Sequence, residues 1–227
     1  MLTQPAITQI PSPPPPYAVT ANRKAGAAES SAFIGVAMSF GRNAEIYAEG
    51  EASGYVYKLL SGVVRVSKLL PDGRRQISAF HLPGEMFGFE ADTFHHASAE
   101  AVVPTKVIAF KWDSSPDASR HPANVTRELL NLAVIGLGHA QDHLLLLGRK
   151  NALERLAAFL LEMDRRVGSN HILDLAMPRH DIADYLGLTL ETVSRMFGEL
   201  KGIGAIELES ARHVHLIGVA KLEAMSA

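Results

Sequence analysis

Residues 178–200 constrain the fold more than any other part of the chain, because they predict two short helices joined by a tight turn. The first helix has one apolar face, formed by Ile182, Ala183 and Leu186. Gly187 is placed to end this helix, and Thr189 is placed to cap the next one. The segment therefore has the pattern of a helix-turn-helix, whose second helix is offered to the DNA major groove.

The second helix divides into an apolar and a polar face. Its spacing predicts a buried stripe made of Leu190, Val193, Phe197 and Leu200. The opposite stripe is polar and consists of Glu191, Ser194, Arg195 and Gly198. We therefore expect a sequence-specific DNA-binding protein; a plain surface ion pair between Glu191 and Arg195 is the alternative for those two residues.

The composition indicates an ordinary globular protein. The chain has 227 residues, of which 47% are hydrophobic and 20% charged, and it holds no cysteine. Disulfides and cysteine-ligated iron–sulfur clusters are thereby excluded. No apolar run is long enough to span a membrane, and the start Met1-Leu-Thr-Gln-Pro lacks the features of a secretory signal. We expect a cytoplasmic protein without a membrane partner.

The charge argues mildly against DNA binding. The chain carries a net charge of −2, and residues 149–227 hold 10 basic and 11 acidic side chains. A protein that coats DNA without regard to sequence would be distinctly basic. A DNA-reading region this close to neutral needs locally placed cations and more base contacts.

The N-terminal two-thirds of the chain divide into three regions of different composition and pattern. Residues 1–30 are rich in proline and alanine, and we expect a disordered extension, with a proline-rich docking peptide as the alternative. Residues 31–115 predict a β-roll or jelly roll, because short alternating runs are separated by glycines and by the turn Pro71-Asp72-Gly73. Residues 116–148 contain a long predicted helix.

That helix carries two apolar rows. One comprises Val125, Leu129, Leu132 and Leu146, and the other Leu130, Val134, Leu137 and Leu144. Two rows need two surfaces to pack against, so we expect one to meet the β-roll and the other a second copy of the chain. Gly136 and Gly138 would let another backbone approach closely. A helix buried within a monomer is the alternative.

Residues 149–227 are expected to form one winged helix-turn-helix domain. Ala152 to Val167 predicts an amphipathic helix that precedes the two helices already described. After them, Ala205–Leu208 and Val214–Ile217 predict a two-stranded wing around a turn at Ser210–Arg212. The predicted fold class is α+β: a β-roll, a dimerisation helix and a winged helix-turn-helix.

This order of elements resembles the Crp/Fnr family of bacterial transcription regulators, over roughly residues 35–220. The resemblance is strongest in Leu186-Gly-Leu-Thr-Leu-Glu-Thr-Val-Ser-Arg195. Other similar segments are Glu49-Gly50-Glu51, Asp72-Gly73-Arg74-Arg75 and Pro83-Gly84-Glu85 with Phe87-Gly88. Within the family, the lack of N-terminal cysteines together with this helix motif suggests the FixK-like branch. The resemblance implies a homodimer that binds double-stranded DNA at a TTGA…TCAA-type palindrome, contacts RNA polymerase and usually activates genes for low-oxygen metabolism or nitrogen fixation.

The resemblance also implies roles for three residues of the second helix. Arg195 corresponds to the family's guanine reader, Glu191 to an acceptor from cytosine, and Ser194 to a position that touches a thymine edge. Supporting or phosphate contacts are expected from Arg179, Thr189, Leu190, Thr192 and His213.

The chain departs from the cyclic-nucleotide-binding members of the family. No arginine occurs from Gly84 to Ser119, so a buried phosphate would lack its cationic partner. We expect no cofactor, with Glu85 kept as a structural residue.

Two alternatives to a DNA-binding regulator remain open. One is a metal-dependent jelly-roll enzyme using His81, His95 and His96 with Glu85 or Glu90. Adjacent His95 and His96 would point to opposite faces of a strand, and no His-x-His pair occurs in this set, so we expect neither a metal site nor an enzyme. The other is a ligand-sensing adaptor that does not bind DNA, which leaves Glu191, Ser194 and Arg195 without a role.

Overall fold

The computed structural model describes residues 35–90, 92–111 and 123–226, with the side chains of the long helix described from residue 130 onward. The predicted extension at residues 1–30 lies outside this part of the chain. Within the described residues, no helix is both long and apolar enough to cross a membrane.

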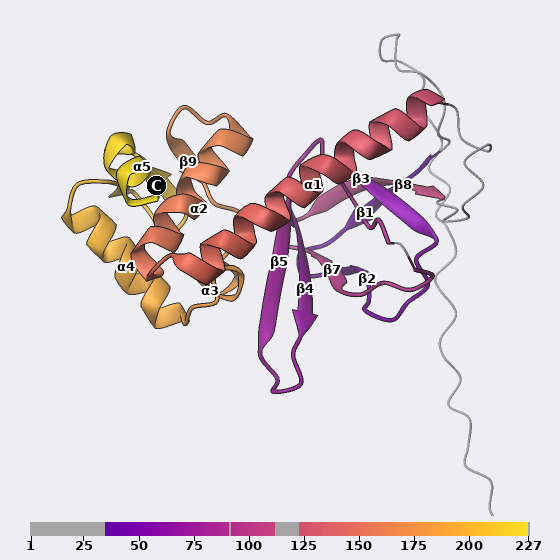
Figure 1. Cartoon of the computed structure of the whole chain (residues 1–227), viewed down its shortest axis with the longest axis horizontal. Coiled ribbons are helices and arrows are strands. Elements are labelled where there is room, and N and C mark those ends of the chain that lie inside the picture. The colour runs from indigo at the N-terminus through magenta and orange to yellow at the C-terminus, as the bar shows by residue number, and fades with distance from the viewer. Residues whose placement is uncertain (1–34, 91, 112–122, 227) are drawn as a thin grey trace, which may run out of the picture. The chain divides into compact units, whose positions relative to one another are not determined.

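The N-terminal region is a roll of two antiparallel sheets (Figure 1). Its strands are β1 (Gly35–Phe40), β2 (Glu45–Tyr47), β3 (Tyr55–Ser61), β4 (Val64–Leu69), β5 (Arg75–His81), β6 (Met86–Phe87), β7 (Ser98–Ala101) and β8 (Thr105–Lys111). One sheet has the order β1-β8-β3-β6 and the other β2-β7-β4-β5. Their inward side chains form a core that includes Tyr47, Tyr57, Leu59, Val64, Phe87 and Val107.

Strand β4 breaks the simple alternation that its sequence predicts. Its register with β5 shifts between Val66 and Ser67, which marks a bulge. Arg65 precedes the bulge and lies on the face opposite the core residue Val64, yet it is buried, with 5% of its surface exposed. Its burial is explained by charged partners described below.

The long helix α1 (Ala123–Arg149) follows the roll and leads into the C-terminal helices (Figure 1). Of the first predicted row, Leu146 is buried and Leu132 half-buried; the side chains of Val125 and Leu129 lie outside the described residues. The second row is exposed along its whole length. Its members are Leu130, Val134, Leu137 and Leu144, each at least 59% exposed, and Ile135 and Leu145 lie beside them.

The C-terminal region consists of four helices and one small sheet. The elements are α2 (Ala152–Val167), β9 (Ile172–Asp174), α3 (Arg179–Leu186), α4 (Leu190–Gly202), β10 (Glu207–Leu208), β11 (His213–His215) and α5 (Val219–Ser226). The sheet has the order β10-β11-β9 and is antiparallel. The wing strands are shorter than predicted, and β9 and α5 were not predicted from the sequence.

Local sequence explains where α2 begins and ends. Asn151 caps its N-terminus by accepting hydrogen bonds from the backbone N–H groups of Leu153 and Glu154, and the Glu154 carboxylate accepts one from the Asn151 backbone N–H. Gly168 ends the helix in the left-handed conformation, at a φ of 65°. The buried face of α2 then forms the centre of the C-terminal core, with Leu156, Phe159, Leu160 and Met163.

Arg155 joins α2 to the ends of two other helices. Its guanidinium donates to the carbonyls of Leu147 and Lys150, near the end of α1, and to that of Leu186 in the last turn of α3. The last carbonyl groups of a helix have no hydrogen-bond partner within the helix. Arg155 therefore supplies donors to carbonyl groups at the ends of both α1 and α3. The end of α1 is thereby tied directly to the helix-turn-helix.

Candidate nucleic-acid interface

The turn between α3 and α4 follows the sequence prediction. Gly187 ends α3 at a φ of 62°, and its N–H donates to the Ala183 carbonyl. A residue with a side chain would be strained in this left-handed conformation. Thr189 then caps α4, its hydroxyl accepting from the Thr192 N–H at 3.2 Å. The turn residues therefore fix the angle at which α4 leaves α3.

The buried face of α4 differs from the prediction at two residues, Leu190 and Met196. Val193, Phe197 and Leu200 are buried as expected, and Met196 completes this face. Leu190, predicted to be buried, is 44% exposed. It is the first residue of the helix, ahead of the turn that packs on the core, and Met196 takes the place beside Val193 and Leu200.

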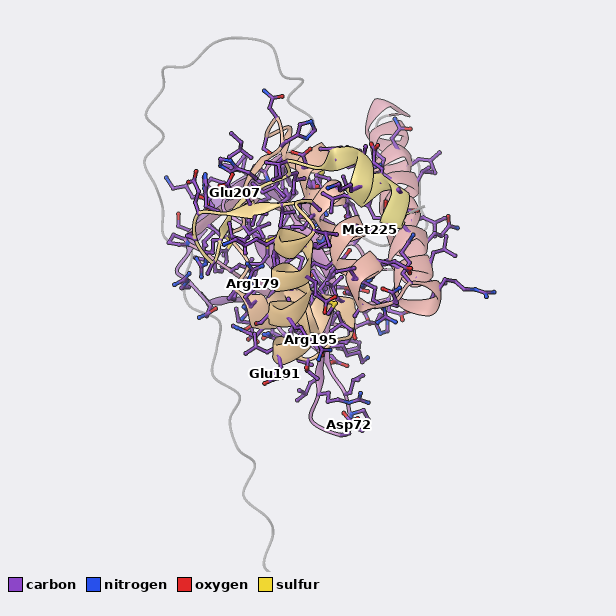
Figure 2. All side chains as sticks on the ribbon, turned by 90° about the vertical axis from the view of Figure 1, so that its left-hand side faces the viewer. Asp72, Arg179, Glu191, Arg195, Glu207 and Met225 are labelled. Atoms are coloured by element: carbon purple, nitrogen blue, oxygen red, sulfur yellow. The ribbon has the colours of Figure 1, made fainter. Side chains whose placement is uncertain are left out.

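The polar face of α4 points away from this core. Glu191, Ser194, Arg195 and Gly198 are all exposed. Figure 2 shows Glu191 and Arg195 on the outward part of α4, toward the end away from Glu207 of the wing. Arg195 approaches Glu199 at 3.9 Å rather than Glu191, and 69% of its side chain is exposed. Arg195 is thus free to exchange this weak surface pair for a base edge.

Glu191 is held by the cap rather than by a cation. Hydrogen bonds from its own backbone N–H and from the Thr189 hydroxyl lower the pKa of its carboxyl group. At neutral pH the side chain is therefore an ionised acceptor at the start of α4. An ionised carboxylate is the form that accepts a hydrogen bond from a cytosine amino group.

The five expected supporting residues differ in accessibility. Thr189 and Leu190 are exposed, Thr192 and His213 are half-buried, and Arg179 lies with its guanidinium carbon 3.0 Å from the ring centroid of Phe197. Burial lowers the pKa of Arg179 to about 10, and its Nη1 atom is buried without a hydrogen-bond partner. The Nη1 atom of Arg179 is therefore not available for a phosphate contact in this position over Phe197.

Acidic residues of α3 attach the helix-turn-helix to the roll, which sequence reasoning missed. The Asp181 carboxylate, 0% exposed, accepts from Arg65 of β4 at 2.7 Å and also from Arg75 of β5. Arg75 also pairs with Asp184 at 2.7 Å, and Arg65 with Glu100 at 3.0 Å. No local pattern signals these pairs, because Arg65 and Asp181 are 116 residues apart.

Glu85 also attaches the roll to the C-terminal region, through an ion pair with Arg166 of α2. Arg166 of α2 donates to both of its carboxylate oxygens at 3.0 Å, and His81 lies 3.4 Å away. Burial raises the pKa of Glu85, but the His81 hydrogen bond and the Arg166 charge outweigh burial and hold that pKa below its ordinary value. This carboxylate is committed to an arginine of its own chain, which fits the structural role expected for it.

The roll histidines do not gather into a site. His95 is buried and stacks on Tyr47 with ring centroids 3.7 Å apart, whereas His96 is exposed and pairs with Asp92 at 2.8 Å. The sequence analysis placed both histidines on a strand, but they lie in the loop before β7. The loop still turns the two rings to opposite environments.

These features together define a DNA-binding transcription regulator: a winged helix-turn-helix joined through a long helix to a β-roll. Residues 154–225 match the family described as "Crp-like helix-turn-helix domain", and residues 37–115 match "Cyclic nucleotide-binding domain". The chain belongs to the Crp/Fnr family of regulators. It is therefore not the jelly-roll enzyme considered as an alternative.

Curated relatives and solved structures agree with this assignment. The nitrogen fixation regulation protein FixK of Rhizobium meliloti is 47% identical over 76% of this chain and 79% of its own length. The protein of the same name from Azorhizobium caulinodans is 43% identical over 87% of this chain and 82% of its own. The structure of FixK2 from Bradyrhizobium japonicum has a TM-score of 0.80 and 46% identity, and the match covers 86% of this chain and 98% of that one.

Proposed function

We propose that the chain acts as a homodimer that places one α4 helix in each of two successive major grooves of a TTGA…TCAA-type palindrome. The observation that carries this proposal is the outward stripe of Glu191, Ser194 and Arg195 on a helix whose other face is buried. In this proposal Arg195 binds guanine O6 and N7 with its fork, Glu191 accepts from cytosine N4, and Ser194 touches a thymine edge. Half-sites lie about one helical turn apart.

The exposed row of α1 supports the dimer. Leu130, Val134, Leu137 and Leu144 offer a continuous apolar stripe that a second copy of the same helix would cover. Burying one such side chain contributes roughly 1.5–3 kcal/mol relative to leaving it in water. A second helix packed on this stripe also sets the distance between the two recognition helices.

The names of the relatives support a role in regulating nitrogen fixation or low-oxygen metabolism, because two of them are nitrogen fixation regulation proteins. In this role the dimer works as an activator through contact with RNA polymerase. The Glu85 carboxylate is already bound by Arg166 of the same chain, which agrees with DNA binding being controlled by something other than a cyclic nucleotide.

Selection of binding sites from random double-stranded DNA tests the proposal. The purified full chain is expected to enrich a TTGA…TCAA-type palindrome with two equal half-sites. Symmetric changes of the guanine in both half-sites should then weaken binding by about tenfold or more. Enrichment of a nonpalindromic site, or of none, contradicts the proposal.

A further inference from the structure

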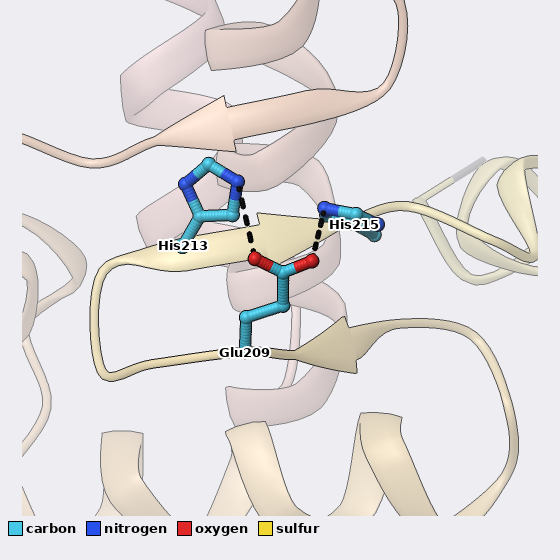
Figure 3. Close-up of side chains that lie close together, drawn as sticks. All are labelled: Glu209, His213 and His215. Atoms are coloured by element: carbon cyan, nitrogen blue, oxygen red, sulfur yellow. Dashed lines mark ion pairs between the residues drawn. The ribbon is translucent and has the colours of Figure 1, made fainter.

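The outer face of the wing gathers two imidazoles and a carboxylate. Val214 and Leu173 point into the core, so their strand neighbours must point outward. His213 and His215 therefore lie on one face of β11, two residues apart. Glu209, just after β10, reaches the same face from the other arm of the hairpin (Figure 3).

The distances from the two imidazoles to the carboxylate match the spacing of ligands around one metal ion. The Nε2 atoms of His213 and His215 lie 3.6 Å and 3.3 Å from the two carboxylate oxygens of Glu209. One ligand atom from each residue lies within 4.8 Å of those of the other two. Ligands about 2.0–2.2 Å from a tetrahedral ion lie roughly 3.3–3.6 Å from each other.

The hairpin holds this arrangement without help from an ion. The Glu209 N–H donates to the His213 carbonyl at 3.2 Å, which pairs the two arms. In the turn, the Ser210 hydroxyl accepts from the backbone N–H groups of Arg212 and His213. The backbone of the ligands is thus ordered in advance, so binding needs only small side-chain rotations.

The surrounding charge favours a cation. Glu207 lies directly opposite His215, and Asp174 of β9 lies directly opposite His213, so both carboxylates share this face. Both side chains are exposed. Together with Glu209, three carboxylates surround two imidazoles, and a divalent ion would offset their mutual repulsion.

We infer that Glu209, His213 and His215 form a wing site for a divalent transition-metal ion that prefers imidazole, Zn²⁺ in particular. Two imidazoles and one carboxylate suit Zn²⁺, Ni²⁺ or Cu²⁺ better than Mg²⁺ or Ca²⁺, which prefer oxygen ligands alone. Water completes the coordination, since the face is open to solvent. The sequence prediction of no metal site considered the roll histidines and overlooked the His213-Val214-His215 pair.

Calorimetric titration of the full chain, without a polyhistidine tag, with Zn²⁺ tests this inference. One ion per protomer is expected to bind. Replacing either histidine, in His213→Gln or His215→Gln, should weaken binding by at least about tenfold, because loss of even a second-shell partner costs that much. Circular dichroism of the metal-free variants establishes that they are folded.

Two control variants separate the site from ordinary surface histidines. His96→Gln and His171→Gln each remove one exposed imidazole that pairs with a carboxylate, to Asp92 at 2.8 Å and to Asp164 at 2.7 Å. Both should bind Zn²⁺ as the unchanged chain does. With Cu²⁺ as probe, electron paramagnetic resonance should show coupling to two imidazole nitrogens. Equal binding by the wing variants and the unchanged chain, or no saturable binding at all, overturns the inference.

Discussion

At the scale of single residues, Arg195 has the geometry of a base reader. It is exposed, its ion-pair partner is the surface residue Glu199, and the opposite face of α4 is buried in the core. Its fork can donate two parallel hydrogen bonds to guanine, which a lysine ammonium cannot do. The role of Arg195 therefore depends on its shape as well as its charge.

Arg195→Ala is expected to weaken binding to the selected palindrome by at least about tenfold and to relax preference at the guanine, because a bidentate contact is worth roughly 1–3 kcal/mol. Arg195→Lys should retain affinity for random DNA but lose that preference. Fluorescence anisotropy at constant salt measures both effects. Arg165→Ala is the matched control, because it removes an exposed arginine of α2. An equal loss in both alanine variants would show that only net charge matters.

The sequence predicted residues with local causes better than residues with distant ones. Gly187 and Thr189 act on their own turn, so helix-end rules located both correctly. The period of α4 predicted three of its four buried residues, but it could not show that Leu190 precedes the packed turn. The burial of Arg65 has no local signal in the sequence, because its buried partner Asp181 is 116 residues away.

At the scale of elements, α1 carries a row of exposed apolar side chains for which the single chain provides no packing partner among the described residues. This row was predicted from spacing alone as a contact with a second copy of the chain, and in the single chain Leu130, Val134, Leu137 and Leu144 are exposed. By contrast, β9 has only three residues, and it exists because β11 pairs with it. Elements defined by a distant partner carry no periodic signal of their own.

Leu137→Glu is expected to convert the dimer into monomers, because it places a charge in the centre of the proposed helix–helix contact. Glutamate is a good helix former, so α1 itself should persist. Sedimentation velocity measures the change in mass, and binding to the full palindrome should fall with it. Leu69→Glu is the control, since Leu69 is 66% exposed at the end of β4. A Leu137→Glu variant that remains dimeric would exclude this face as the interface.

At the scale of the whole molecule, charged pairs link the roll to the helix-turn-helix. Asp181 is the centre of this linkage, because its fully buried carboxylate joins Arg65 and Arg75. A buried pair adds little stability beyond an apolar replacement, but removal of one partner leaves the other charge without compensation. The linkage therefore fixes how the two regions dock more than it stabilises either one.

Asp181→Ala is expected to lower the free energy of unfolding by about 3–5 kcal/mol, since the buried Arg65 loses the carboxylate that its Nη1 atom binds and keeps only Glu100, at its Nε atom. Asp184→Ala should cost at most about 1 kcal/mol, because Asp184 is 29% exposed and its pair with Arg75 is partly solvated. Urea denaturation measures both. Adding Arg65→Met to Asp181→Ala should recover much of the loss; a double variant no more stable than Asp181→Ala would count against this explanation.

The ion pair between Glu85 of the roll and Arg166 of α2 should make the stability of the chain decrease in acid. The pKa of Glu85 is lower in the folded chain than its ordinary value of 4.5, so the unfolded chain binds this proton more readily. The stabilisation is complete above about pH 4.5 and decreases as the pH falls through the lower, folded pKa.

Glu85→Gln, which cannot ionise, should lose less stability than the unchanged chain between pH 5 and pH 3. Urea denaturation at successive pH values measures the two slopes, with Glu45→Gln as a control on the roll surface. Identical slopes for Glu85→Gln and the unchanged chain would show that the carboxylate does not contribute as a charge.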